Sequence, residues 1–229
     1  MKGICLIILM IFTSGCQSKK PPTQVVYRFD DHRYLELKGW NCEGELWYID
    51  TVRGIRSQPA SQFYRIFTHK YVHPSERYIA VASWDYITGA FLVSKDYGQS
   101  WHVASMSPGP NEPDGMNAPE YDKVISFTVV NDQGFLETKN GLYTSSKPFD
   151  DPRVQPGGPG IKYVIEGDEY HITPQFPGSA WGDSYMTKKG LKEDTLQYHV
   201  EWQGLPDKVP EVKNYKGWDH MRCDYDAGK

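Results

Sequence analysis

The sequence has 229 residues, and its 25 Lys and Arg against 29 Asp and Glu give a formal net charge of −4. A nucleic-acid-binding domain usually shows a basic patch and a high isoelectric point, so this balance argues against nucleic acid as a partner. Aromatic residues make up 14% of the chain and occur with 21 Gly and 16 Pro, which favours short strands joined by turns over long helices.

The N-terminus has the features of a lipoprotein export signal. Lys2 precedes an apolar run over residues 4–12, and Thr13-Ser14-Gly15-Cys16 follows it. The run is too short to span a bilayer, which needs about 20 residues, but a basic start, a short apolar core and small residues before a cut site define a secretory signal. A cysteine directly after Ser-Gly indicates cleavage before Cys16 and attachment of a diacylglyceryl group to its sulfur. An ordinary signal peptide with a chance cysteine is the alternative.

The segment after the signal predicts a tether. Residues 16–24 are polar and include Pro21 and Pro22, so we expect a flexible linker with roughly 3 Å of reach per residue. After removal of the signal, residues 1–15, it would connect the lipidated Cys16 to a single β-rich domain over residues 25–229. In enteric-type bacteria an Asp directly after the lipidated cysteine retains a lipoprotein in the inner membrane, whereas this chain has Gln17. We therefore expect a lipid-anchored protein that faces the periplasm from the outer membrane.

The cysteines predict one disulfide. Cys5 would leave with the signal and Cys16 would carry lipid, which leaves Cys42 and Cys223 in a compartment that oxidises thiols. A Lys-Gly-Trp tripeptide stands shortly before each of these two cysteines. We predict that they pair and join the two ends of the chain; two free buried thiols are the alternative.

Alternating or short apolar runs between turn residues predict a series of strands. The predicted strands, in chain order, are residues 25–30, 34–40, 46–51, 63–72, 78–84, 90–94, 124–130, 134–138, 142–145, 161–165, 170–173 and 195–202. Asn131-Asp132-Gln133 and Asn140-Gly141 mark two hairpin turns. No stretch shows helical periodicity over three turns, and residues 188–197 have room for one short helix.

Three long segments rich in Pro and Gly interrupt this pattern, at residues 107–121, 147–160 and 173–183. Long loops in a compact domain are often functional, and Tyr and Trp are enriched in binding hot spots. We therefore name candidate partner-binding residues in two aromatic-rich stretches, residues 84–86 and 176–181, against the alternative that each belongs to the core. They are Trp84, Asp85, Tyr86, Phe176 and Trp181.

One motif has a defined local structure. The octapeptide that begins at Ser94 matches the Asp-box pattern Ser-x-Asp-x-Gly-x-x-Trp, with Ser100 where Thr is common. In such a β-hairpin turn Asp96 accepts hydrogen bonds from loop amides, Gly98 takes a backbone conformation that other residues resist, and Trp101 packs under the turn. Asp boxes are structural and occur in sialidase-like β-propellers. We therefore expect an all-β fold, a small or incomplete β-propeller-like arrangement of antiparallel blades, with a β-sandwich as the alternative.

The sequence shows no convincing catalytic or metal-binding pattern. The tetrapeptide at residues 64–67 resembles the Phe-Arg-Ile-Pro motif of sialidases but lacks the Pro, and only one good Asp box is present. His69 and His73 lie four residues apart in a predicted strand, which separates them by roughly 13 Å, too far to share an ion. No Gly-x-Ser-x-Gly elbow and no phosphate-binding glycine loop occurs. We therefore expect a non-enzymatic protein without metal or cofactor, which acts as a binder or an assembly part.

Several stretches together resemble a known family. Residues 27–37, with the sequence YRFDDHRYLEL, resemble the opening of a family of lipoprotein immunity proteins that accompany lipase effectors of the type VI secretion system. Further similar stretches are residues 63–67, 73–76, 94–101, 125–134, 145–149, 209–214 and 217–223. The resemblance runs in order through most of the mature chain and is weakest over residues 163–203.

The resemblance implies a function. The protein would bind a cognate phospholipase effector in the periplasm, while its lipid anchor holds it to the membrane, and would block the active site of the effector or its access to lipid. No cofactor is required for such inhibition. Two other classes stay open: a structural or assembly lipoprotein of the envelope, and an Asp-box carbohydrate-binding or sialidase-like protein.

Overall fold

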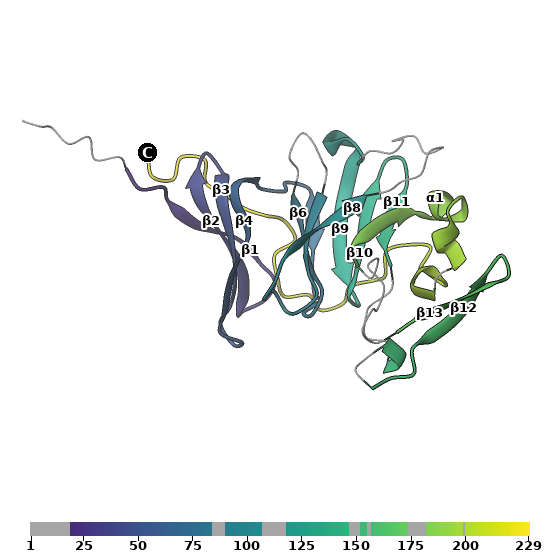
Figure 1. Ribbon diagram of the computed structural model, residues 1–229. Coiled ribbons are helices and arrows are strands. Elements are labelled where there is room, and N and C mark those ends of the chain that lie inside the picture. Colours follow the sequence, from purple (N-terminus) through teal and green to yellow (C-terminus); the bar gives the residue numbers. More distant parts are fainter. Residues whose placement is uncertain are drawn as a thin grey trace, which may run out of the picture.

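The computed structural model describes residues 19–83, 90–106, 118–146, 152–154, 157–173, 182–198 and 200–229. The strands form a four-stranded sheet, an eight-stranded sheet and a separate two-stranded hairpin (Figure 1). The helical elements are short: α1 (Lys188–Lys192) and the 3-10 turns η1 (Tyr121–Lys123), η2 (Pro152–Val154), η3 (Thr195–Tyr198) and η4 (Val200–Trp202). The prediction of an all-β fold is confirmed.

The first sheet contains four strands in chain order, each antiparallel to the next. They are β1 (Thr23–Arg28), β2 (Arg33–Trp40), β3 (Glu43–Asp50) and β4 (Ile55–Arg65). Along β2, Leu35 and Leu37 are buried, whereas Tyr34, Glu36 and Lys38 between them stay partly exposed. This alternation gives the sheet one face toward the core and one face toward solvent, as is common for antiparallel sheets.

The second sheet contains eight strands in the order β5-β9-β10-β11-β14-β8-β7-β6. Their bounds are β5 (Lys70–Val72), β6 (Ile79–Ser83), β7 (Ala90–Ser94), β8 (His102–Met106), β9 (Val124–Val130), β10 (Gln133–Thr138), β11 (Leu142–Ser145) and β14 (Ser184–Thr187). Two pairs, β5 with β9 and β14 with β8, are parallel. The Tyr71 hydroxyl donates to Ala80 O at 2.6 Å, and Ala80 N donates to His73 Nε2 at 3.1 Å. These bonds join the two end strands, so the sheet curls into a half-barrel.

Tight turns connect neighbouring antiparallel strands in both sheets. Asn41 and Cys42 between β2 and β3, and Asn131 and Asp132 between β9 and β10, have positive φ angles of 52° to 60°. Positive φ at both central residues defines the type I′ turn, whose twist matches that of the flanking strands. The Asn131 turn was predicted from the sequence, and it sets the register of β9 against β10.

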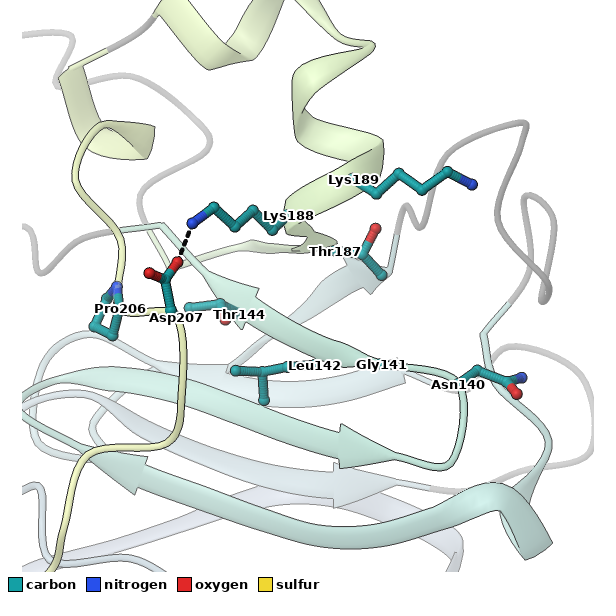
Figure 2. Close-up of a pocket in the computed structure, with 9 residues that line it drawn as sticks. All are labelled: Asn140, Gly141, Leu142, Thr144, Thr187, Lys188, Lys189, Pro206 and Asp207. Atoms are coloured by element: carbon teal, nitrogen blue, oxygen red, sulfur yellow. Dashed lines mark hydrogen bonds and ion pairs between the residues drawn. The ribbon is translucent and has the colours of Figure 1, made fainter.

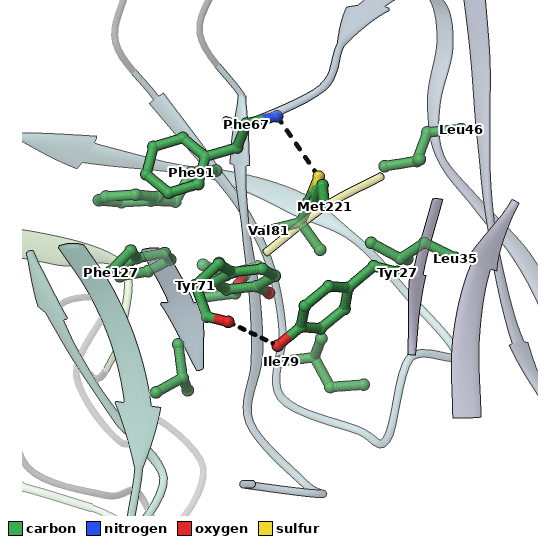
Figure 3. Packing of buried hydrophobic residues seen from close by; sticks show 14 of the residues in the cluster. Tyr27, Leu35, Leu46, Phe67, Tyr71, Ile79, Val81, Phe91, Phe127 and Met221 are labelled. Atoms are coloured by element: carbon green, nitrogen blue, oxygen red, sulfur yellow. Dashed lines mark hydrogen bonds between the residues drawn. The ribbon is translucent and has the colours of Figure 1, made fainter. Parts of the chain in front are cut away.

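Aromatic side chains fill the curl of the large sheet and its contact with the small one (Figure 3). The rings of Phe91 and Phe127 stack with centroids 4.2 Å apart, and the Tyr185 ring lies 4.4 Å from that of Phe91. Tyr27 from β1 packs on Tyr71 from β5 at 4.4 Å and donates a hydrogen bond of 3.0 Å to Tyr71 O. Each buried hydroxyl of this kind needs a partner, and the Tyr27 bond joins the two sheets in the core.

The C-terminal segment, residues 203–229, contains no helix or strand and runs as an irregular strap past both sheets (Figure 1). Arg222 N donates to Val26 O in β1, and Tyr71 N in β5 donates to Asp219 O, both at 2.8 Å. Met221 is buried between these contacts, where its sulfur accepts a hydrogen bond from Phe67 N at 3.4 Å (Figure 3). The strap therefore satisfies backbone groups of both sheets and closes the core between them.

A disulfide fixes the end of the strap. Cys42, in the turn between β2 and β3, is bonded to Cys223, with the Cα atoms 6.0 Å apart and a sequence separation of 181. Nearby, Asp224 N donates to Gln24 Oε1 at 2.8 Å, and Gln24 Nε2 donates to Asp224 O at 3.1 Å. The C-terminus therefore lies beside the start of β1 (Figure 1).

The expected propeller-like arrangement is not confirmed. Propeller blades are separate four-stranded antiparallel sheets, whereas the described strands include one curled eight-stranded sheet with two parallel pairs. The predicted strand over residues 63–72 is instead the end of β4 and the whole of β5. Thr68 lies between these strands, and its N–H bonds to the Tyr121 hydroxyl at 2.7 Å, so the chain leaves the first sheet here and enters the second.

The alternating run over residues 195–202 was wrongly predicted as a strand. It forms η3 and η4, because turn bonds satisfy its backbone: Asp194 Oδ1 accepts from Leu196 N at 2.8 Å, and Asp194 O accepts from Gln197 N at 3.2 Å. Strands β8 and β14 were missed. Both are short and contain Ser, His or Thr among few apolar residues, so no local periodicity marks them.

Candidate functional site

The residues of the predicted Asp box form one hydrogen-bonded turn between β7 and β8. Asp96 Oδ1 accepts from Gln99 N at 3.0 Å and from Ser100 N at 2.9 Å, and Ser94 Oγ accepts from Gly98 N at 2.8 Å. Partial burial alone would raise the pKa of Asp96, but the hydrogen bonds, above all those from Ser100, lower it below its ordinary value. The carboxylate is thus held ionised inside the turn.

This turn also docks the large sheet on the small one. Trp101 Nε1 donates to Ser57 Oγ in β4 at 2.8 Å, and the Trp101 ring lies 5.7 Å from the Tyr48 ring of β3. Gly98 has a φ of +90°, and a Cβ there would lie 2.3 Å from Tyr48 Cε1. These residues hold one sheet against the other, which is a structural role.

A charged cluster joins β14 to β8 close to the same turn. Asp183 accepts from Lys95 Nζ at 2.5 Å and contacts the His102 imidazole, while Asp183 O accepts from Ser105 N at 2.8 Å. The parallel pairing of β14 with β8 begins at Ser184, directly after these contacts. The cluster therefore positions a strand junction.

The two histidines considered as metal ligands have separate partners. His73 is fully buried and accepts from Ala80 N, whereas His69 Nε2 bonds to Tyr121 O at 2.9 Å. Within the part of the chain that the structure describes, no group of three or more His, Cys, Asp or Glu side chains is placed to hold a metal ion. In the same part, no helix has both the length and the apolar character to cross a membrane.

The solvent face of the first sheet has an unusual content of aromatic and arginine side chains, and we call it the outer face. The Arg56 guanidinium lies 3.8 Å above the centre of the Trp47 ring, and Arg28 lies 5.3 Å from that of Tyr34. Trp47 Nε1 also donates to Glu45 at 3.2 Å. Tyr, Trp and Arg are the residue types enriched at the centres of protein interfaces, so the outer face is suited to bind a protein.

A second candidate surface is the hairpin of β12 (Ile161–Ile165) and β13 (Asp168–Ile172). It pairs with neither sheet and projects from the end of the molecule opposite the start of β1 (Figure 1). The rings of Tyr163 and Tyr170 stack across the strands at 5.5 Å. This hairpin is the most projecting of the described β elements.

A shallow pocket of about 300 Å³ lies between α1 and the turn before β11 (Figure 2). Leu142 forms part of its floor, and Lys188 and Asp207 form an ion pair at its edge. Thr187 caps α1 by accepting from Gly190 N at 2.9 Å. An exposed ion pair already occupies the polar edge, and the pocket shows no grouped catalytic side chains among its lining residues.

The remaining predicted site residues fall in two groups. Cys42 and Cys223 form the disulfide described above. The predicted lipidation site Cys16 and the candidate binding residues Trp84, Asp85, Tyr86, Phe176 and Trp181 lie outside the described residues, so their roles stay predictions.

Both candidate surfaces were missed at the sequence level. Most of their strands were predicted, but residues 55–62 of β4, which contain Arg56, were not. Alternation also assigns a face to solvent without showing which side chains of neighbouring strands group there. A usable signal was the presence of aromatics at the solvent-facing positions, such as Tyr34 and Trp47. Such residues are uncommon where a strand alternates cleanly between apolar and polar positions.

The fold and its surfaces define a class: a disulfide-linked all-β protein with aromatic and arginine side chains on the solvent face of one sheet and a separate projecting hairpin. A family model described as T6SS Tli3 immunity protein matches residues 19–138, which span the whole first sheet and strands β5 to β10. The chain belongs to this family of immunity proteins, which act against lipase effectors of the type VI secretion system. A search of curated proteins finds no match.

Proposed function

We propose that this protein binds a phospholipase effector of the type VI secretion system in the periplasm and neutralises it there. The observation that supports the proposal most directly is the family match over residues 19–138. An immunity protein needs a surface complementary to its effector and no catalytic machinery. The proposed role is therefore that of a non-enzymatic inhibitor without cofactor or metal.

Two features support the proposed location. A disulfide such as that between Cys42 and Cys223 persists in oxidising compartments, the periplasm included. The sequence of residues 1–16 predicts export and lipidation of Cys16, and the described chain enters β1 at Thr23 after only a short segment. A short tether would keep the inhibitor beside the bilayer that the effector attacks, and Gln17 favours the outer membrane.

The outer face supports tight binding of a protein. The Arg56 guanidinium already contacts the Trp47 ring, 3.8 Å from its centre, so part of its side-chain freedom is restricted before a partner covers it. Interfaces of stable complexes bury about 1,600 Å² in total and are centred on such residues. Binding of this kind would cover the active site of the effector or the surface by which it reaches lipid.

A survival assay tests the proposal. A type VI lipase effector, sought first among the neighbouring genes, is expressed with a periplasmic signal in a sensitive host, with and without the immunity protein. We expect killing without it, survival with it, and a stable complex on co-purification. With Cys16→Ala we expect weaker protection, because the local concentration at the membrane falls, while the affinity of the purified proteins stays unchanged.

The same assay can also contradict the proposal. Equal killing with and without the protein, together with no detectable complex, would remove this effector as the partner. Deletion of the gene in cells that meet no attacker then tests the envelope-assembly alternative, which requires an envelope defect under those conditions.

A further inference from the structure

The β12–β13 hairpin has an apolar face that the body of the protein covers only at one end. Ile161 and Ile172 pair at its base and are buried. The next residues on that face are the stacked pair Tyr163 and Tyr170, and Tyr170 is 44% exposed. Because side chains alternate along a strand, Ile165 lies on the same face one step nearer the tip. The apolar stripe therefore leaves the core and continues into solvent.

The tip of the hairpin is acidic. It contains the carboxylates of Glu166, Asp168 and Glu169 against the single ammonium group of Lys162. Lys162 pairs with Glu169 at 3.3 Å. Glu166 and Asp168 make no ion pair with any part of the described chain. Two uncompensated carboxylates therefore stand beside exposed apolar groups on both faces of the hairpin: Tyr170 on the apolar stripe, at 44% exposure, and Val164 on the opposite face, at 61%.

The geometry of the tip fixes this arrangement. Glu166 and Gly167 both have positive φ angles, 52° and 100°, as in a type I′ turn that holds two strands in a single register. At the other end, Gly160 N donates to Arg153 O at 2.8 Å, and β12 contacts η3. The hairpin is thus a projection with a defined strand register that contacts η3.

The position of the hairpin indicates what it meets. It lies at the far end of the molecule from the start of β1 (Figure 1), and the proposed lipid tether precedes β1. The tether therefore leaves the molecule at the end away from the hairpin. The hairpin also lies beyond residues 19–138, the part that matches the family model, where features that distinguish one effector from another are expected.

We propose that the β12–β13 hairpin docks on the lipid-facing surface of the effector by presenting carboxylates beside apolar side chains, the two features of an anionic bilayer surface. This inference rests on the proposed function. An enzyme that works on anionic phospholipid approaches it with a basic and apolar surface, because basic residues near such a bilayer are attracted to it. The acidic, apolar hairpin complements that surface in charge and in hydrophobicity.

A binding experiment with matched variants tests the inference. The mature chain with Cys16→Ala is exported behind a cleavable signal, purified, and titrated with the effector at two salt concentrations. We expect Glu166→Gln with Asp168→Asn and Glu169→Gln to weaken binding at least about tenfold and to flatten its salt dependence. The control removes three exposed charges elsewhere, Glu120→Gln with Glu211→Gln and Asp226→Asn, and should leave both quantities unchanged.

A second variant pair tests the apolar contribution. Val164→Ser with Tyr170→Ser should weaken binding about tenfold or more with little change in salt dependence. Its control is Val103→Ser with Tyr225→Ser, a Val and a Tyr of similar exposure outside the hairpin. Val164 and Val103 are 61% and 63% exposed, and Tyr170 and Tyr225 are 44% and 56% exposed. Circular dichroism of each variant shows whether the fold is retained, and the charge variants keep the test valid if the serine variant unfolds.

Vesicles show whether the bound surface is the lipid-facing one. Vesicles of ether-linked phosphatidylethanolamine and phosphatidylglycerol, which have no acyl ester bond for a lipase to hydrolyse, are mixed with the effector and sedimented. We expect the unanchored immunity protein to release the effector from these vesicles and the charge variant to fail to do so. If both proteins sediment together on the vesicles, the inference is overturned.

Two further results would overturn the inference and leave the proposed function standing. One is unchanged affinity for the effector in all hairpin variants. The other is a dimer of this chain in light scattering that the hairpin variants dissociate, since the unpaired edges of β12 and β13 would then serve a second copy. Absence of any complex with the unsubstituted protein would instead contradict the proposed function itself.

Discussion

Gly98 shows how one residue fixes the contact between the two sheets. Its φ is +90°, and a Cβ would lie 2.3 Å from Tyr48 Cε1. We expect Gly98→Ala to lower the free energy of unfolding by about 2 kcal/mol or more, because backbone strain and overpacking add. Gly54 is the matched control: its φ is +67° with no atom within 4 Å of a built Cβ, so Gly54→Ala should cost only about 1 kcal/mol. Equal losses in urea unfolding would show that the contact with Tyr48 is unimportant.

His73 gives a prediction for pH dependence. Burial, followed by the charge of Arg33, holds the pKa of the folded-state imidazole well below 6.5. Below that pH the unfolded chain binds a proton that the folded chain does not. The free energy of unfolding should therefore fall by up to about 1.4 kcal/mol per pH unit as the pH drops from 6.5 toward the folded-state pKa, and should be unaffected by this group above pH 7.

Urea unfolding at pH 7.5, 6 and 5 measures this effect. In the folded chain the pKa values of Asp30, Asp50 and Asp96 lie below the ordinary value of 3.8. The stability that these carboxylates contribute is therefore lost only at a pH more acidic than the range of this experiment. His73→Gln removes the titrating group and should flatten the profile between pH 7 and 5. An identical slope in the variant would mean that other groups cause the acid sensitivity.

At the scale of elements, the C-terminal strap and its disulfide determine how the two sheets stay together. Replacement of both Cys42 and Cys223 by Ser releases the end of the strap, which bonds β1 and β5. The chain-entropy model gives about 5 kcal/mol for so long a loop, and removal of a native disulfide typically costs about 2–5 kcal/mol. We expect a loss in that range in urea unfolding. Reduction of the unsubstituted protein should reproduce the loss, and an unchanged midpoint in both experiments would contradict the role given to the strap.

Some of the strands are recognisable in the sequence, and others are not. Strands β7, β9, β11 and β12 have the predicted bounds, because apolar runs end at turn residues such as those of the Asn140-Gly141 turn. Residues 195–202 alternate like a strand, but local turn bonds around Asp194 stabilise 3-10 turns there instead. The short strands β8 and β14 acquire their place from a parallel pairing between segments far apart in the chain, and no local pattern encodes such a pairing.

For the whole molecule, composition and turns predicted an all-β protein, whereas the half-barrel could not be derived from them. The curl depends on bonds such as that from the Tyr71 hydroxyl to Ala80 O, which join strands at opposite ends of one sheet. The contact surfaces are equally non-local. Arg56 lies over Trp47 across two strands of the first sheet. The Tyr163–Tyr170 pair is exposed because η3 covers only part of the hairpin.

The central claim is that this chain inhibits a phospholipase directly, and one reconstituted measurement tests it. Release of fatty acid from phosphatidylethanolamine and phosphatidylglycerol vesicles by the purified effector is followed with increasing amounts of the purified mature chain carrying Cys16→Ala. We expect hydrolysis to fall in proportion to the added protein and to stop near one equivalent, as for tight binding. An undiminished rate at large excess would contradict direct inhibition.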